Sequence, residues 1–203
     1  MSLFDSLATT MIDLDRAGAM FAIVGGLAVG IRTEPRFTRD ADMAVSVVND
    51  HEAELIVFYL VSRGYRTVAS LEQEVTGRLA TVRLVPPLSN DAGVIVDLRF
   101  ASCVIEPEIV AAATREAIAL DVTGPVASIG HLIAMKTLSE SDRRFQDRGD
   151  LLSLLHASSP TDLEMARAAL RLISDRGFAR DKDLGVVLQR FIDLANTVGE
   201  PLP

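Results

Sequence analysis

The sequence is poor in the residues that usually make disulfides and nitrogen or sulfur metal sites. It has one cysteine, Cys103, among 203 residues. This excludes an intramolecular disulfide and a cysteine metal cluster, and we expect Cys103 to be a buried, unreactive thiol. The three histidines, His51, His131 and His156, are widely scattered without metal-ligand spacing. None of them is therefore assigned to chemistry.

Long apolar runs are also missing. No run approaches the roughly 20 residues that a helix needs to span a bilayer. The first residues, MSLFDSLATTMIDLDRAG, contain aspartates instead of the basic flank and apolar core of a signal peptide. We expect no membrane association and a cytoplasmic location.

Lysine is scarce, and the charge balance is acidic. The chain has eighteen arginines but only two lysines, Lys136 and Lys182, and its net charge is −8. Arginine richness is interpreted here as a result of genomic base composition. An acidic surface does not attract nucleic acid broadly through counterion release, so any phosphate site must be local.

What is present predicts one compact protein with an α/β (α+β) core. Apolar residues make up 49% of the chain, enough for one sizeable core. Helical spacing is found at 4–14 and at 53–61, the latter after Asp50 in an N-cap position. Short segments rich in β-branched residues predict strands at 21–24, 43–47, 79–85 and 94–100. From 128 onward only helices are predicted, at 128–139, 143–156, 162–175 and 182–197. We expect a mixed sheet flanked by helices over residues 1–123, followed by a helical bundle over 124–203.

Two aspartates in the segment DADMAVSV are the first candidates for chemistry. If the segment is a strand, Asp40 and Asp42 point to the same side, because side chains alternate with a period of two. Neighbouring carboxylates repel each other unless a cation is present. Oxygen ligands favour Mg²⁺ or Mn²⁺, so the pair predicts a site for a hard divalent metal.

Asp97 is a third candidate, because it interrupts the apolar segment GVIVDLRFAS. On a strand beside Asp40 and Asp42 it would complete a set of metal ligands. Three convergent carboxylates can hold two ions about 3.5–4 Å apart for an in-line phosphoryl displacement. Asp97 would then orient or deprotonate the incoming hydroxyl.

Gly25 and Gly26 follow the apolar run FAIV directly. A strand that ends in two glycines and leads into a helix exposes backbone N–H groups in a concave turn, which suits phosphate oxygens. The chain has no GxxxxGK[ST] motif, so this would not be a P-loop. A simple tight turn is the alternative.

Four segments in a fixed order resemble a known family. GG, RFTRDAD, VDL and LIAMKTLSESDRRFQDRGDLLSLL resemble the nucleotidyltransferase superfamily, most closely its AbiEii/AbiGii-type toxin branch, over residues 21–155. The resemblance implies that Gly25 and Gly26 hold the nucleotide phosphates. It also implies that Asp40 and Asp42, with Asp97 at the third acidic position, bind the metals. Many superfamily members have a serine where this chain has Gly26, so one phosphate contact would be missing.

The same resemblance suggests that Lys136 contacts the triphosphate. A lysine that extends to solvent is the alternative. Arg36 or Arg39, just before the metal strand, could bind the triphosphate through a bidentate contact. Asp147 and Asp150 lie three residues apart beside several arginines, so we interpret them as structural or supporting residues.

The predicted activity is transfer of a nucleoside monophosphate from a nucleoside triphosphate to a hydroxyl, with release of pyrophosphate. The acceptor could be a tRNA end, a protein or a small molecule, and the resemblance allows a toxin with an antitoxin partner. A haloacid-dehalogenase-type phosphatase leaves the glycines unexplained, and a DxD glycosyltransferase leaves the Lys136 segment unexplained. A catalytically inactive domain of the same fold, acting as a binding module, is the non-enzymatic alternative.

Overall fold

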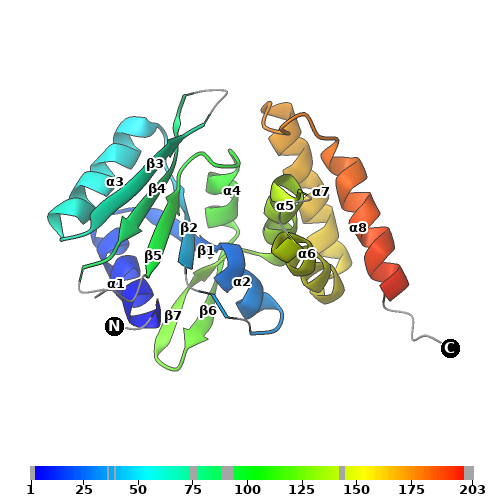
Figure 1. Ribbon diagram of the computed structural model, residues 1–203, viewed down its shortest axis with the longest axis horizontal. Helices are drawn as coiled ribbons and strands as arrows, with labels where there is room; N and C mark the ends of the chain where they lie inside the picture. The colour runs from blue at the N-terminus through cyan, green and yellow to red at the C-terminus, as the bar shows by residue number, and fades with distance from the viewer. Residues whose placement is uncertain are drawn as a thin grey trace.

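The computed structural model describes residues 3–35, 37–38, 40–73, 77–87, 94–141 and 145–198. Within these ranges the chain forms a seven-stranded sheet and eight helices (Figure 1). The strands are β1 (Met20–Val24), β2 (Asp40–Ser46), β3 (Arg66–Glu72), β4 (Leu79–Val85), β5 (Ile95–Arg99), β6 (Thr114–Ala119) and β7 (Val122–Val126). The helices are α1 (Leu3–Arg16), α2 (Gly25–Arg32), α3 (Asp50–Ser62), α4 (Glu106–Ala111), α5 (Ile129–Ser139), α6 (Phe145–Ala157), α7 (Pro160–Asp175) and α8 (Leu184–Val198).

The sheet has the order β3-β4-β5-β2-β1-β7-β6 and is mixed. β2 pairs with β5, and β1 with β7, in parallel, whereas the other neighbours are antiparallel. Helices α5 to α8 lie together beside the sheet, at the right of Figure 1. The predicted fold class, a mixed sheet with helices and a helical C-terminal region, is therefore confirmed.

The boundary predicted between residues 123 and 124 falls inside β7. The sheet continues to Val126, and the first helix of the C-terminal region begins at Ile129. A division of the chain into two units stays a prediction. Strands β3, β6 and β7 and helix α4 were not expected.

Helices α1 and α3 pack on the sheet and on each other. The α1 residues Leu7, Met11 and Leu14 are buried, as their spacing predicts. The predicted N-cap of helix α3, Asp50, is instead its first helical residue. The N-cap is Asn49, whose side chain accepts a hydrogen bond from the Glu52 amide at 3.0 Å. Asp50 instead receives the Arg78 Nε at 3.1 Å.

Arg32 joins the end of α2 to strands β6 and β7, at one edge of the sheet. Its guanidinium donates to the backbone oxygens of Ala127 and Val126 at 2.9 and 2.8 Å, and to Glu116 at 2.6 Å. The side chain is only 15% exposed. These bonds hold the C-terminal end of α2, the helix that begins at Gly25.

The C-terminal helices are joined to one another and to helix α4 by ion pairs. Glu140, at the end of α5, is buried and accepts from Arg148 of α6 at 3.0 Å and from Arg190 of α8 at 3.1 Å. Arg176, after α7, binds Glu108 of α4 at 2.6 Å. The helices therefore form a fixed wall opposite the sheet.

Two further expectations concern single features. Cys103 is buried, as predicted, and burial raises the pKa of its thiol well above the usual value. Among the helices in the described ranges, none is long and apolar enough to cross a membrane.

Candidate active site

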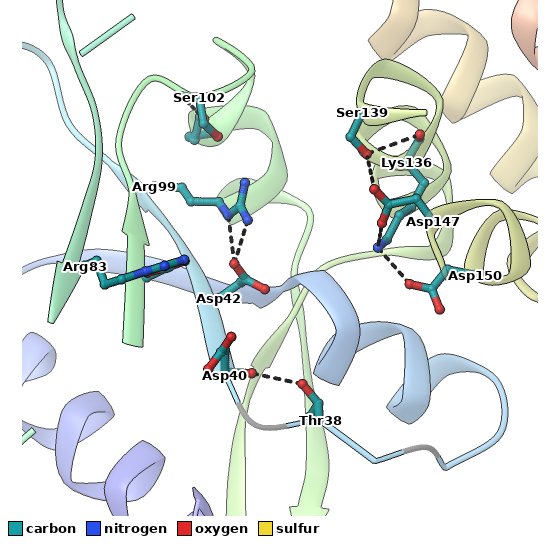
Figure 2. Close-up of polar contacts among 12 residues, drawn as sticks. Thr38, Asp40, Asp42, Arg83, Arg99, Ser102, Lys136, Ser139, Asp147 and Asp150 are labelled. Carbon is teal, nitrogen blue, oxygen red and sulfur yellow. Dashed lines mark hydrogen bonds and ion pairs between the residues drawn. The ribbon is translucent and has the colours of Figure 1, made fainter. Parts of the chain in front are cut away.

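A cleft of about 720 Å³ lies between the sheet and the C-terminal helices. Its sheet wall comes from the α2 turn, the segment before β2, and strands β2, β4 and β5, and its helical wall comes from α5 and α6. The lining residues are Gly25, Gly26, Phe37, Thr38, Asp40, Asp42, Arg83, Asp97, Arg99, Leu132, Met135, Lys136, Ser139, Gln146 and Asp147. Figure 2 shows polar residues of the two walls facing each other across this space.

Three aspartates converge on the sheet wall because of strand register. Asp42 of β2 is the direct neighbour of Asp97 on the parallel strand β5. Asp40 lies two residues before Asp42 and lines the same cleft, as the alternation predicts. Residues aligned in register on adjacent strands point to the same face. The structure thus brings together the three carboxylates that the sequence singled out.

Two arginines that the sequence reasoning missed are paired with these aspartates. Arg83 of β4 is aligned with Asp97 and binds it with both ends of its fork, Nε to Oδ1 and Nη2 to Oδ2, each at 2.8 Å. Arg99 donates to Asp42 Oδ1 from Nε at 3.1 Å and from Nη2 at 2.6 Å (Figure 2). The alternation in DLRF places Arg99 on the face of Asp97, and this signal was available in the sequence. The face of Arg83 depends on the register between β4 and β5.

These pairs change the electrostatics of the site. The hydrogen bonds and negative charge of Asp97 raise the pKa of Arg83. Burial opposes the charge of Arg99, but Asp42 outweighs it and raises the Arg99 pKa. Both guanidiniums therefore stay charged and neutralise the carboxylates. The repulsion for which the sequence suggested a divalent metal is relieved here by arginine.

The carboxylates of the cleft suit a metal chemically but are not assembled for one. Aspartate oxygens are the ligands that Mg²⁺ and Mn²⁺ prefer. Within the described ranges, however, no group of three or more histidine, cysteine or acidic side chains is placed to hold a metal ion. Both oxygens of Asp97 already accept hydrogen bonds from Arg83. The donor type suits a hard cation, because Mg²⁺ usually takes one or two protein carboxylates and keeps several waters.

Gly25 has a steric reason to be glycine. Its φ is +64°, and a Cβ at this position would lie 2.0 Å from Asp42 Oδ2. Gly25 also begins α2, whose N-cap residue, Val24, has no side-chain acceptor for the first amides. The glycine therefore lets the Asp42 carboxylate approach the start of the helix, where backbone N–H groups can bind anions.

Lys136 lies on the helical wall within a compact ion cluster. Its Nζ is 2.5 Å from Asp147 Oδ1 and 2.7 Å from Asp150 Oδ2, and Ser139 Oγ donates to Asp147 at 3.3 Å. The lysine side chain is 12% exposed. It does not extend into solvent, and the two aspartates of α6 support it. Their interpretation as structural or supporting residues stays a prediction.

The other expected nucleotide ligands are placed as follows. Gly25, Gly26 and Lys136 line the cleft together with the aspartates. Arg39 and Arg36 lie outside the described residues. Between them, Thr38 Oγ1 donates to the backbone oxygen of Asp40 at 3.1 Å.

No known protein-family model and no curated protein sequence matches the chain. Among solved structures, it is similar to an antigenic nucleotidyltransferase-like protein from Paracoccidioides brasiliensis, with 20% identity, 91% of this chain and 93% of that chain covered, and a TM-score of 0.49. It is also similar to the antibiotic-resistance factor ANT(2'')-Ia, with 16% identity, coverages of 96% and 94%, and a TM-score of 0.48. A third similar structure is the lincosamide antibiotic adenylyltransferase LnuA, with 12% identity, 76% of this chain and 97% of that chain covered, and a TM-score of 0.46.

These similarities concern the path of the chain, and the chemistry of the cleft has to be inferred from its own residues. The toxin branch suggested by the order of the sequence segments is not among these structures. Membership in that branch stays a prediction.

The steric role of Gly25 can be tested against a matched glycine. Gly18 also has positive φ, +71°, but nothing lies within 4 Å of a Cβ built there. Gly18→Ala should cost only the left-handed strain, about 1–2 kcal/mol. Gly25→Ala should cost more in denaturant unfolding, because the methyl group must displace the Asp42 carboxylate. Equal losses in the two variants would contradict the steric role.

The ion cluster predicts a stability effect at Lys136. Lys136→Met should lower the free energy of unfolding by about 3 kcal/mol, because Asp150 and Asp147 then lose a buried counterion. Adding Asp150→Asn should recover part of the loss by removing one uncompensated charge. Urea unfolding of the parent, both single variants and the double variant gives the coupling energy. Purely additive losses would show that Lys136 and Asp150 do not interact energetically.

Proposed function

We propose that the protein is a metal-dependent nucleotidyltransferase that transfers a nucleoside monophosphate from a nucleoside triphosphate to an acceptor hydroxyl. The observation that carries the proposal is the register pairing of Asp42 with Asp97, with Asp40 on the same face, in a cleft that also contains the glycine turn. A phosphoryl-transfer site needs anionic ligands for a cation beside donors for phosphate oxygens. Both kinds of group line this one cleft.

The donors for phosphate would be distributed over both walls. Gly25 and Gly26 offer the amides at the start of α2, and Lys136 lies opposite them on α5. Arg39, which directly precedes Asp40 in the sequence, is proposed as a further phosphate ligand. The triphosphate would therefore lie between the sheet and the helical wall, with its α-phosphate near the three aspartates.

The reaction itself is a displacement at phosphorus. The acceptor oxygen forms a bond to the α-phosphorus, the bond from that phosphorus to the bridging oxygen breaks, and pyrophosphate leaves. Asp97 orients the acceptor hydroxyl and takes its proton. Arg83 hydrogen-bonds both Asp97 oxygens and stabilises the charged carboxylate, so movement of Arg83 away from Asp97 would favour this role.

Asp40, Asp42 and Asp97 would hold Mg²⁺ or Mn²⁺. The cation would supply neutralisation of the negative charge that develops on the phosphate oxygens. This fits the composition of the cleft, whose described lining residues carry four carboxylates, from Asp40, Asp42, Asp97 and Asp147, beside its basic groups. A polyanionic substrate needs additional positive charge in such a place.

A tRNA end, a protein hydroxyl and a small molecule are the three acceptor classes, and labelling a cell lysate with α-labelled nucleotides identifies the modified one. A toxin role with an antitoxin partner is supported only by the order of the sequence segments. The alternative, an inactive binding module of the same fold, is opposed by the retention of all three aspartates.

Nucleotide binding should depend on Asp42. A triphosphate with Mg²⁺ or Mn²⁺ should stabilise the parent, by roughly 2.7 kcal/mol at 100 times Kd. Asp42→Asn should remove this increment, because it loses a charged ligand but keeps its shape. Asp50→Asn is the matched control, since Asp50 also pairs with an arginine but outside the cleft. A parental shift in Asp42→Asn, measured by thermal unfolding, would exclude Asp42 from the site.

Catalysis should depend on Asp97. Asp97→Asn keeps most of the packing but loses basicity, so transfer of α-labelled nucleotide to an acceptor in cell extract should fall by about 10²-fold or more in turnover. Nucleotide binding should stay measurable. Transfer at the parental rate would exclude Asp97 from the mechanism. If the parent labels nothing with any of the nucleotides and either metal, the binding module becomes the better explanation.

A further inference from the structure

Arg83 and Arg99 bind two of the aspartates that would hold a metal ion. Arg83 donates a hydrogen bond to each oxygen of Asp97, and Arg99 donates two hydrogen bonds to Oδ1 of Asp42. In Figure 2 both guanidiniums reach the aspartate cluster from the sheet side of the cleft. These hydrogen bonds take up lone pairs that a cation would use, and the two positive guanidiniums repel a cation at this place.

The two arginine side chains are more exposed than the aspartates that they bind. Their side chains are 44% and 32% exposed, in contrast to 8% for Asp97 and 16% for Asp42. The arginines therefore extend into the open cleft, while their partners are held in the sheet. A long side chain with solvent beside it can change rotamer without disturbing the strand.

Guanidinium groups bind phosphate with the same planar fork that binds carboxylate. Both arginines line the cleft in which the triphosphate is proposed to lie. When a cation neutralises the aspartates, the attraction that holds the guanidiniums there is removed, and phosphate oxygens are the next acceptors within the cleft. The same side chains can therefore serve both states.

We propose that Arg83 and Arg99 are placeholder arginines: they hold Asp97 and Asp42 in the substrate-free protein and move to the phosphate groups when metal and triphosphate bind. The proposal rests on the proposed function for its second half. Under this proposal the metal and the polyphosphate strengthen each other's binding. Both bind best to the state in which the arginines have left the carboxylates.

The first test uses Mn²⁺ alone, followed by electron paramagnetic resonance or calorimetry. Arg83→Gln and Arg99→Gln should each bind Mn²⁺ roughly tenfold more tightly than the parent, since the ion no longer competes with a charge-assisted pair. The matched control is Arg78→Gln, which removes an arginine from Asp50 outside the cleft and should leave Mn²⁺ affinity unchanged. Unchanged or weaker Mn²⁺ binding in both cleft variants overturns the placeholder role.

The second test uses inorganic tripolyphosphate in excess Mn²⁺, which probes the phosphate contacts without a choice of base. Both cleft variants should bind it roughly tenfold more weakly than the parent, the opposite direction from their effect on Mn²⁺ alone. Parental affinity for tripolyphosphate in both variants overturns the movement to phosphate. If Arg99→Gln does not fold, Arg83→Gln, which alters the more exposed side chain, decides both tests.

Failure of the proposed function looks different from failure of this inference. A parent that transfers no nucleotide and gains no stability from triphosphate and metal refutes the function, whereas the Mn²⁺ comparison still decides whether the arginines block a cation. A parent that transfers nucleotide, with cleft variants that bind Mn²⁺ and tripolyphosphate as it does, refutes the placeholder arginines alone.

Discussion

Asp42 and Asp97 are neighbours in the register of two parallel strands, so two like charges share one face of the sheet beside a third, Asp40. Such an arrangement is unfavourable unless positive charge lies close by. Arg83 and Arg99 supply that charge from within the sheet, one of them from β4, which contributes no acid to the cleft. The approach of the Asp42 carboxylate to the start of α2 in turn requires a glycine at position 25.

The helical wall also pairs opposite charges, but here a largely buried cation is held by two carboxylates. One lysine, Lys136, is enclosed by Asp147 and Asp150. α5 also ends in bonds to other helices: Lys182, which precedes α8, donates to the backbone oxygens of Leu138 and Glu140. Each wall thus pairs opposite charges internally, but the carboxylates named on each wall still outnumber its basic groups.

The sequence predicted the acidic side of the site well, because strand alternation is a local property. The period of two places Asp40 with Asp42 and separates Asp97 from its apolar neighbours. Pairing of Asp97 with Arg83 depends on register between segments that lie fourteen residues apart, and local pattern does not determine register. The strands that escaped prediction have physical reasons too: β3 lies at the sheet edge with almost every residue exposed, and β6 is the other edge. Neither shows the apolar alternation of a half-buried strand.

The chemical difference between arginine and lysine fits the difference between the two walls. Lys136 is 12% exposed and held between two carboxylates, whereas Arg83 is 44% exposed and held by one. An ammonium is a compact charge with three donors, so a pair of aspartates can hold it while its third N–H binds a phosphate oxygen. A guanidinium is a planar fork, so it matches carboxylate and phosphate equally well in geometry. A cation that must exchange one oxyanion for another is therefore better served by arginine, and a cation that must stay in place can be lysine. A general bias toward arginine would not by itself place arginines at the exposed positions that face the three aspartates, where exchange of partners has the most room.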